Sequence, residues 1–229
     1  MPGRSAEVER LRAVYDGYDR DDAARRRWDL TNAGNRAIHA ERTIRIAALL
    51  GGLTGPVLDV GCGTGQVLEE LAASGVRPPL RIGVDLVAER LVQAAHRVPD
   101  VALVQAEGSA LPLTDGAVGT ALAFTLFSSL LDEELARAVA AEVARVVRPG
   151  GTVLWYDLRR RNPRNPAVRA WTAPEVAALF PGWEVDLAPA TVLPPLVRRL
   201  GPLAPRVYPG LARLRPLTTH LLGVARRPR

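Results

Sequence analysis

Short apolar runs alternate with amphipathic segments through the middle of the chain, from Pro56 to Asp157. The apolar runs predict five strands, and the segments between them, in which apolar residues recur at helical spacing, predict three helices. The strands are expected at Val57–Val60, Leu80–Val84, Val101–Val104, Val118–Phe124 and Thr152–Tyr156, and the helices at Gln66–Ser74, Val87–His96 and Asp132–Val147. This alternation predicts an α/β fold with a doubly wound, mostly parallel sheet covered on both faces. Pro149-Gly150-Gly151 predicts a turn into the fifth strand.

The two flanks of this core have patterns of their own. Residues 6–50 contain few glycines and repeat apolar side chains at helical spacing, which predicts helices ahead of the sheet. After Asp157, Thr172 is placed to cap a short helix, and two further strands are expected at Trp183–Leu187 and His220–Arg226. The sheet would then have seven strands within a single domain, residues 1–229. Its parts would be a helical prelude (1–52), a ligand-binding core (56–157) and a C-terminal part (158–229) with an insertion before the last strand.

Three glycines, Gly61, Gly63 and Gly65, follow the first predicted strand at alternate positions, and a helical pattern begins directly afterwards. Glycine permits positive φ angles and lets a ligand approach the backbone closely. The first amide groups of the following helix have no intrahelical partners and attract polar or negative groups. A strand, a glycine turn and a helix in this order therefore predict a nucleotide-type binding site.

Residues around this turn narrow the choice of nucleotide. A dinucleotide fingerprint needs a further glycine or alanine, but the positions that it would occupy are Gln66 and Leu68. A Walker-type phosphate loop needs a lysine, and the chain contains none. Asp85 ends the second strand about twenty residues after the turn, where a carboxylate can accept hydrogen bonds from both ribose hydroxyls. The pattern therefore favours a ribose-bearing ligand without a 2′-phosphate.

Four segments in order resemble class I S-adenosylmethionine-dependent methyltransferases. Val57–Gln66 resembles the first motif of that family, Gly83–Leu86 its second-strand acid, Glu107–Leu113 its adenine-contacting segment and Arg145–Gly151 its turn into strand five. The pattern is most similar to the small-molecule branch that includes the quinone C-methyltransferases. The resemblance implies the Rossmann-like methyltransferase fold with an N-terminal helical lid. It also implies S-adenosyl-L-methionine as methyl donor and S-adenosyl-L-homocysteine as product.

The resemblance assigns a role to each matching residue. Asp59 would bind the methionine amino group, Gly61, Gly63 and Gly65 the methionine part and ribose, Asp85 the ribose hydroxyls, Leu86, Glu107 and Gly108 the adenine, and Phe124 would flank the sulfur. Glutamate stands at position 107, where the family usually has aspartate. Three residues also have ordinary alternatives, because Asp59 could cap a turn, Phe124 could belong to the core, and Glu107 could be a solvated loop acid.

The methyl-acceptor side has no comparable motif. Methyl transfer from a sulfonium to an oxygen, nitrogen or carbon nucleophile depends on alignment and exclusion of water, and only some acceptors need a general base. His39 in the helical prelude and Asp157 at the end of the fifth strand are the tentative catalytic residues; a solvated helix face is the alternative for His39. Tyr15 and Tyr18 are placed either to close over the donor or to pack.

Composition limits the partners. All 30 basic residues are arginine, and we interpret the net charge of +6 as coding bias more than as a binding surface. Aromatic residues make up 5 %, and Ala123–Leu126 lacks the motif expected after strand four in many nucleic-acid amino methyltransferases, so a nucleic acid is not favoured. The single cysteine, Cys62, excludes an intrachain disulfide, and no metal site is predicted. Because the amino terminus resembles no secretory signal, we expect a soluble, cytoplasmic protein.

The segment Pro194–Pro216 is dense in leucine, proline and arginine and has two interpretations. It could be a packed cap with solvated arginines, which we favour, or a pocket wall for an apolar or lipid-linked acceptor that rests on an anionic membrane surface. The predicted function is methyl transfer to a small molecule, with an apolar, glycan or lipid-linked compound as candidate acceptor. An RNA or protein methyltransferase and a non-catalytic S-adenosylmethionine-binding relative stay open as alternatives.

Overall fold

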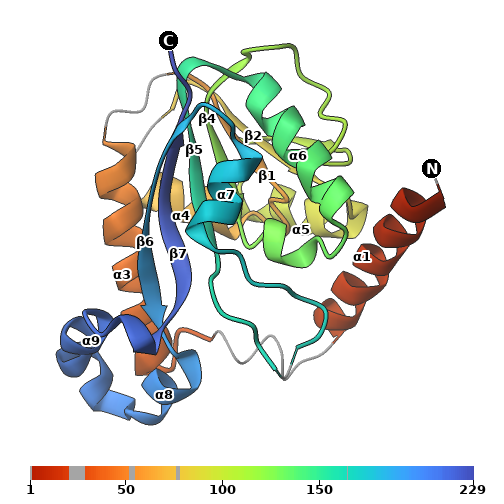
Figure 1. Cartoon of the computed structure of the whole chain (residues 1–229). Coiled ribbons are helices and arrows are strands. Elements are labelled where there is room, and N and C mark those ends of the chain that lie inside the picture. The colour runs from red at the N-terminus through yellow and green to blue at the C-terminus, as the bar shows by residue number, and fades with distance from the viewer. Residues whose placement is uncertain (1, 21–28, 52–54, 76–77, 164) are drawn as a thin grey trace.

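The computed structural model describes residues 2–20, 29–51, 55–75, 78–163 and 165–229. The strands are β1 (Val57–Val60), β2 (Arg81–Asp85), β3 (Ala102–Gln105), β4 (Val118–Phe124), β5 (Val147–Leu158), β6 (Glu184–Val192) and β7 (Thr218–Arg226). They form one sheet in the order β3-β2-β1-β4-β5-β7-β6, in which β7 pairs antiparallel with β5 and with β6 and the other pairs are parallel. The predicted doubly wound, mostly parallel, seven-stranded fold is therefore confirmed (Figure 1).

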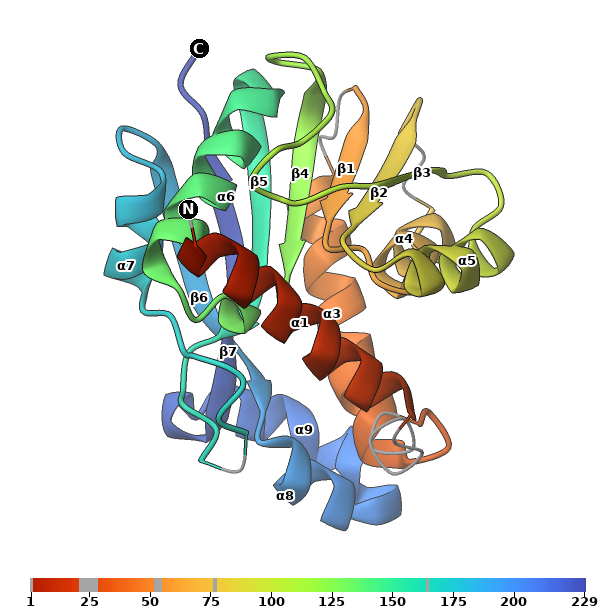
Figure 2. The same ribbon diagram turned by 90° about the vertical axis from the view of Figure 1, so that its right-hand side faces the viewer.

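Helices cover both faces of this sheet. They are α1 (Pro2–Arg20), α3 (Ala33–Leu50), α4 (Gln66–Ala73), α5 (Ala88–Arg97), α6 (Glu133–Val146), α7 (Ala173–Leu179), α8 (Pro194–Arg199) and α9 (Ala204–Ala212), with the short 3-10 helices η1 (Phe127–Ser129), η2 (Gly201–Leu203) and η3 (Arg215–Leu217). α6 and α7 pack on one face, and α3 and α4 pack on the other. The N-terminal helix α1 runs past the end of β4, at the edge of the sheet where the parallel strands end (Figure 2).

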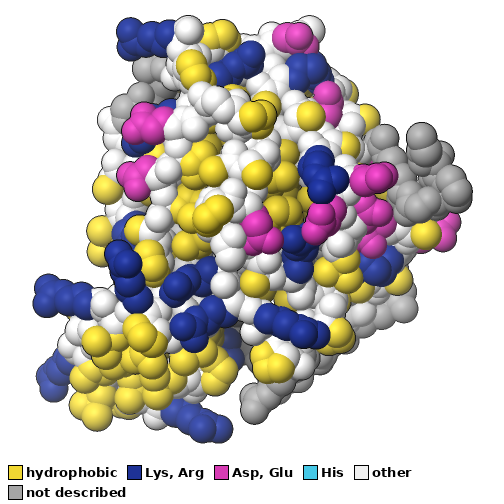
Figure 3. Space-filling model, in the orientation of Figure 1, with side chains coloured by type: hydrophobic (Ala, Val, Ile, Leu, Met, Phe, Trp, Pro, Cys, Tyr) yellow, Lys and Arg dark blue, Asp and Glu magenta, His cyan; other side chains and the backbone are white. Residues whose placement is uncertain are grey.

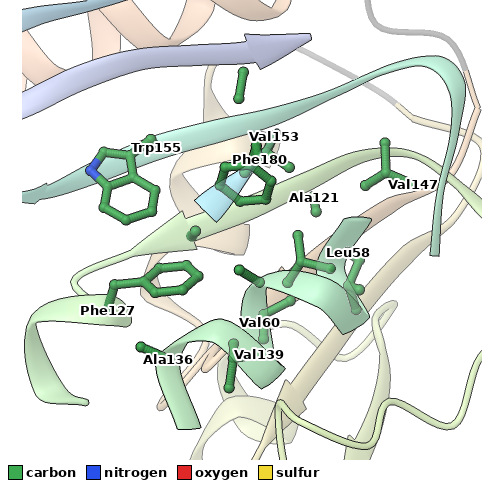
Figure 4. Packing of buried hydrophobic residues seen from close by; sticks show 14 of the residues in the cluster. Leu58, Val60, Ala121, Phe127, Ala136, Val139, Val147, Val153, Trp155 and Phe180 are labelled. Atoms are coloured by element: carbon green, nitrogen blue, oxygen red, sulfur yellow. The ribbon is translucent and has the colours of Figure 1, made fainter. Parts of the chain in front are cut away.

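The larger core cluster lies between the sheet and helices α6 and α7. Trp155 of β5 is fully buried and stacks on Phe127 of η1 with 4.6 Å between the ring centroids, and Phe180 belongs to the same cluster (Figure 4). Successive side chains of a strand point to opposite faces, so Leu58 lies in this cluster while Val57 lies in the cluster beneath α3 and α4. Burial on both faces explains why these strands are continuous apolar runs in the sequence.

The helix starts follow from capping chemistry in the sequence. Asn32 caps α3 by accepting from the backbone N–H groups of Gly34 and Asn35, and Asp132 caps α6 by accepting from that of Leu135. At α7 the predicted cap Thr172 forms a complete capping box with Glu175, whose carboxylate accepts from the Thr172 N–H at 2.7 Å. These caps satisfy amide groups that a helix leaves unpaired at its first turn.

Strand β5 differs from the expectation. It begins at Val147 instead of Thr152, so Pro149-Gly150-Gly151 lies within the strand and not in a turn before it. Val118 pairs with Val147 but Thr120 pairs with Thr152, which makes residues 148–151 a local irregularity of the ladder. Gly150 has a φ of 72°, so the chain bends here while the strand continues.

Strand pairing at Gly223 predicts a sharp sensitivity to substitution. A Cβ at this position of β7 would lie 2.0 Å from the backbone oxygen of Asp186 on β6, and two paired strands cannot separate locally without breaking their ladder. We expect Gly223→Ala to lower the free energy of unfolding by about 2–3 kcal/mol in urea denaturation. Gly210→Ala, in helix α9 where a Cβ would meet nothing within 4 Å, is the control and should not lower it, since alanine favours a helix over glycine by about 0.5–1 kcal/mol. Equal stability of both variants would contradict the close approach.

Candidate functional site

A cavity of about 250 Å³ opens at the carboxyl ends of the parallel strands. Its lining comes from the glycine turn after β1, the end of β2, the loop after β3 and the end of β4, and it is completed by side chains of α1, α3, α5 and α6. Open α/β sheets bind ligands at this edge, beside the point where the strand order reverses, which here lies between β1 and β4. Most of the residues predicted to bind a cofactor line this cavity.

The glycine turn has the backbone conformation that its sequence predicts. Gly61, Gly63 and Gly65 have φ angles of 74°, 52° and 79°, a region in which side chains are disfavoured. The Gly61 N–H donates to the backbone oxygen of Val84 at 2.8 Å, which continues the pairing of β1 with β2 into the turn. Gly61 and Gly63 line the cavity.

Gly65 has a different position from the other two glycines. It lies at the N-cap of α4 and outside the cavity lining, and a Cβ there would approach Val98 at 3.0 Å and Ala94 at 3.2 Å. Its N–H donates to the backbone oxygen of Cys62 within the turn. The missing side chain therefore allows α4 to start close against α5.

Asp85 connects the turn to the second strand. Its Oδ2 accepts the N–H of Gly63 at 2.7 Å and its Oδ1 accepts the N–H of Val87 at 2.9 Å, directly before α5 begins. The residue is buried and lines the cavity. A carboxylate oxygen can accept more than one hydrogen bond, so both oxygens keep capacity for a ligand.

Asp59 lies within β1, two residues before the glycine turn. It is 1 % exposed, and its Oδ2 is among the buried side-chain atoms of the described residues that have no hydrogen-bond partner. Burial, to which the negative charges of Asp85 and Glu70 add, raises the pKa of this carboxyl to about 8. An unpartnered buried carboxylate is costly, and a cationic or hydrogen-bond-donating ligand would relieve it.

The remaining predicted cofactor residues surround the same cavity. Leu86, Glu107, Gly108 and Phe124 all line it. Ser109 Oγ is 3.5 Å from Glu107 Oε2, and Phe124 packs on Tyr156 with 5.4 Å between the ring centroids. Phe124 is thus both part of a core cluster and part of the cavity wall, so the two interpretations of this residue do not exclude each other.

The two tentative catalytic residues lie outside the lining of this cavity. His39 on α3 places its Nε2 3.1 Å from Glu70 Oε1. Asp157 is fully buried, and its carboxylate accepts the N–H groups of Ser128 at 2.9 Å and Leu158 at 2.7 Å. Burial raises the pKa of Asp157 to about 6, while these hydrogen bonds act in the opposite direction. Both residues therefore hold neighbouring elements in place around the cavity.

Helix α1 forms one wall of the cavity through Val8, Leu11 and Tyr15. The Tyr15 hydroxyl lies 2.8 Å from Ser129 Oγ, and Glu7 Oε1 accepts the N–H of Leu131 at 2.9 Å. The helix is thereby fastened to the segment after β4, as a lid would be. Tyr15 was identified from sequence as a residue that could close over the donor, whereas the side chain of Tyr18 lies outside the described part of the structure.

Three further side chains of the cavity had no signal in the sequence. Arg90 of α5 holds its guanidinium over the Tyr15 ring, 4.6 Å from the centroid. Arg42 of α3 pairs with Glu70, and Tyr156 of β5 places its hydroxyl 2.7 Å from Thr191 Oγ1. All three line the cavity, but each comes from an amphipathic helix or a buried strand where an arginine or a tyrosine is ordinary.

Comparison with known proteins agrees with this geometry. Residues 57–151 match the family described as methyltransferase domain. This part of the chain is similar to methyltransferase domains. The match covers β1 to β4, the glycine turn and Asp85, and it ends inside the irregular start of β5.

Two curated relatives cover more of the chain. The demethylmenaquinone methyltransferase of Beutenbergia cavernae is 35 % identical over 137 residues, 58 % of this chain and 54 % of that protein. The phthiotriol/phenolphthiotriol dimycocerosates methyltransferase of Mycobacterium tuberculosis is 32 % identical over 151 residues, 62 % of this chain and 46 % of that protein. The chain thus spans about half the length of the curated relatives that it matches.

Solved structures show the same fold over most of the chain. The N-methyltransferase NodS from Bradyrhizobium japonicum, in complex with S-adenosyl-L-homocysteine, has a TM-score of 0.68 at 16 % identity and covers 96 % of this chain and 99 % of its own. The [4+2]-cyclase SpnF has a TM-score of 0.62 at 20 % identity and covers 82 % of each chain. The fold therefore serves more than one reaction, and the reaction must be argued from the site.

No helix in the described ranges is long and apolar enough to cross a bilayer. Within the same ranges, no group of three or more histidine, cysteine, aspartate and glutamate side chains is arranged to hold a metal ion. Cys62 is buried in the turn, and burial raises the pKa of its thiol, so it lacks the thiolate character of a nucleophile.

The raised pKa of Asp59 predicts how stability depends on pH. Folded Asp59 holds its proton more tightly than an unfolded aspartate, whose pKa is 3.8, so its stabilising contribution is complete below pH 4 and is lost as pH rises to about 8. We expect Asp59→Asn to reduce the fall in melting temperature between pH 5 and pH 8 by about 4 °C. Asp186→Asn, at an exposed position of β6, controls for loss of a carboxylate. Unaltered pH dependence in Asp59→Asn would contradict a protonated, buried Asp59.

Proposed function

We propose that the protein is a methyltransferase that uses S-adenosyl-L-methionine and acts on a small molecule. The observation that carries this proposal is the pair of buried carboxylates at the glycine turn. Asp85 lines the cavity and is fixed by two backbone N–H groups, while Asp59 lies beneath the turn with an unpartnered oxygen. The Asp85 carboxylate suits a diol, and a bound ammonium group would favour the ionised form of Asp59. S-adenosyl-L-methionine carries both a ribose and an ammonium group.

The residues present fit this cofactor. Asp59 lies buried behind the cavity lining and would hold the amino group directly or through water. The backbone of Gly61 and Gly63 would lie along the methionine part, and Asp85 would accept the ribose hydroxyls. Leu86, Glu107 and Gly108 would surround the adenine, and Phe124 would lie beside the sulfur. When bound, the cofactor supplies a methyl group on a positively charged sulfur, ready for in-line displacement. The family match and the NodS complex support the same donor.

The chain's own contribution to the reaction would be alignment and exclusion of water. α1 lies across the cavity and is held by Tyr15 and Glu7, so a bound acceptor would be enclosed between this helix and the sheet edge. Burial raises the pKa of both Tyr15 and Tyr156, so these phenols stay protonated at neutral pH. They would donate hydrogen bonds to the methyl acceptor, including to its nucleophilic atom after that atom has lost a proton. Because they are protonated, they would not act as general bases.

The acceptor that best suits this cavity is a largely apolar small molecule. Much of the cavity lining is aliphatic and comes from α1, α6 and the segment after β4, namely Val8, Leu11, Leu126, Leu130, Leu135 and Val139. The names of the curated relatives refer to demethylmenaquinone and to phthiotriol dimycocerosates, which supports an apolar acceptor by analogy. An RNA or a folded protein surface would have to enter beneath α1, which leaves little room for either.

Titration calorimetry with S-adenosyl-L-homocysteine tests the donor site. We expect the wild-type protein to bind and Asp85→Ala to bind at least about tenfold more weakly, because two charge-assisted hydrogen bonds are lost. Asp85→Asn keeps the volume and one acceptor oxygen and should lie between them. Asp100→Ala, in the exposed turn after α5, is the matched control. Binding of NAD in place of S-adenosyl-L-homocysteine, or unchanged affinity of Asp85→Ala, would refute the assignment.

Transfer of radiolabelled methyl groups tests the reaction itself. Purified protein and labelled S-adenosyl-L-methionine are incubated with an apolar extract, an RNA fraction or a protein fraction of a bacterial lysate. We expect label only in the apolar extract, and less of it with Tyr15→Ala, which removes part of the lid. Label in RNA or protein would support the alternative acceptors. Cofactor binding without any labelled product would indicate a non-catalytic relative.

A further inference from the structure

The C-terminal cap, defined as residues 193–217, is a firmly attached part of the molecule. It comprises α8, η2, α9 and η3, and its inner face packs on α3 through a cluster that includes Val197, Tyr208 and Ile38. Gly34 of α3 allows close contact, since a Cβ there would lie 2.5 Å from the backbone oxygen of Val197. The Tyr208 hydroxyl donates to Glu41 at 2.6 Å. The cap therefore presents its outer face in a fixed orientation.

The outer face of the cap is strongly apolar. Ten large hydrophobic side chains are exposed among the described residues, and four of them belong to this segment: Leu196, Leu203, Val207 and Leu214. Leu203 is 57 % exposed and Leu214 is 52 % exposed. Five prolines of the segment are exposed as well, at positions 195, 202, 205, 209 and 216. Figure 3 shows the resulting apolar area over α8 and α9, at the lower left of the molecule.

Positive charge surrounds this apolar area. Arg199, Arg206, Arg213 and Arg215 are exposed, and the sequence contains no acidic residue from Leu187 to its last residue. Arg159, from the loop after β5, donates to the backbone oxygen of Arg215. The positive charges of Arg160 and Arg215 add to burial in lowering the pKa of Arg159. The dark blue side chains that ring the apolar area in Figure 3 thus form a cationic rim.

These arginines contrast with several arginines elsewhere in the chain. Arg42, Arg145 and Arg169 each form an ion pair with a carboxylate of the same molecule. Across the described ranges, no such ion pair is formed by Arg199, Arg206, Arg213 or Arg215. Their charge is therefore open to an external partner, and that partner must be anionic and must also accept exposed leucines.

We propose that the cap docks on the surface of an anionic lipid bilayer. Leu196, Leu203, Val207 and Leu214 would enter the boundary between headgroups and acyl chains, and the arginine rim would lie against the headgroup phosphates. A second copy of the chain fits less well, because a two-fold contact would bring the same arginines against each other. A nucleic acid would use the arginines but leave the leucines in water.

The position of the cap relates this surface to the cavity. β6 leads into the cap and runs parallel to β5, so the cap lies at the same edge of the sheet as the cavity. Tyr156 of the cavity wall contacts Thr191 immediately before the cap. If the proposed function holds, docking would place the cavity entrance near the bilayer, from which an apolar acceptor could enter.

Vesicle co-sedimentation of the full chain tests the docking independently of any reaction. The probes are vesicles of phosphatidylcholine alone and of phosphatidylcholine mixed with phosphatidylglycerol, and we expect binding only to the mixture. Arg206→Glu/Arg213→Glu should weaken it at least about tenfold. Leu203→Ser should weaken it about fivefold, and the residual binding of that variant should be more sensitive to salt.

The control variants make the same chemical changes away from the cap. Arg137→Glu/Arg226→Glu alters net charge equally on α6 and β7, and Val92→Ser removes an exposed valine of α5. Binding lost equally by these controls, or equal binding to both vesicle types, would overturn the proposal. So would a dimer in light scattering that Leu203→Ser dissociates. Calorimetry with S-adenosyl-L-homocysteine on each variant verifies the fold. A variant that binds this ligand normally while the wild-type protein ignores anionic vesicles would contradict the docking proposal alone and leave the donor site intact.

Discussion

The hydrogen bond from the Gly63 N–H to the Asp85 carboxylate is the contact on which the site depends. It connects the glycine turn, whose glycines have left-handed backbone conformations, to the end of β2. The second oxygen of the same carboxylate accepts the N–H of Val87 and so fixes the start of α5. It completes the set of hydrogen bonds that fix the three glycines with positive φ, because Gly61 and Gly65 donate only to backbone oxygens of Val84 and Cys62. One buried side chain therefore connects the glycine turn to the start of α5.

A second carboxylate nearby shows that this arrangement was not selected for stability alone. Asp59 contributes to the same buried region and lacks a partner for Oδ2, and burial together with the charges of Asp85 and Glu70 raises its pKa to about 8. A valine or leucine in β1 would fill the position without that cost. The strand keeps an acid where the fold would favour an apolar residue, and such conflicts between local stability and sequence are expected at functional sites.

Much of the fold and the donor side of the site could be predicted from sequence because they depend on local patterns. β1 and β4 have the predicted bounds, since short apolar runs with glycine or polar residues at their ends are clear signals. The glycine turn and Asp85 were found because their spacing along the chain sets their geometry. The prediction of a turn at Pro149-Gly150-Gly151 was wrong, because a proline followed by two glycines is typical of a turn. Only the pairing with β4, whose register shifts between Val118 and Thr120, shows that the strand continues through these residues.

The acceptor side could not be predicted, because its residues meet only through long-range packing. Tyr15 and Ser129 are in contact but lie far apart in the sequence, and the same is true of Glu7 and Leu131. No rule of sequence spacing predicts either contact. His39 pairs with Glu70, and Asp157 accepts hydrogen bonds beneath η1. A titratable residue at a plausible point in the topology is therefore weak evidence for catalysis until its own hydrogen bonds are known.

The arginine-rich composition also acquires meaning only in three dimensions. Counted along the chain, the excess of arginine is explained by coding bias, and many arginines are neutralised within the molecule, as Arg145 is by Glu142 and Asp115. Bias does not explain why acids are absent from the last part of the chain while exposed leucines gather there. If arginine replaced lysine uniformly, acidic residues would still be interspersed on every solvated surface. Their absence from one apolar face is the feature that an anionic, partly apolar partner accounts for.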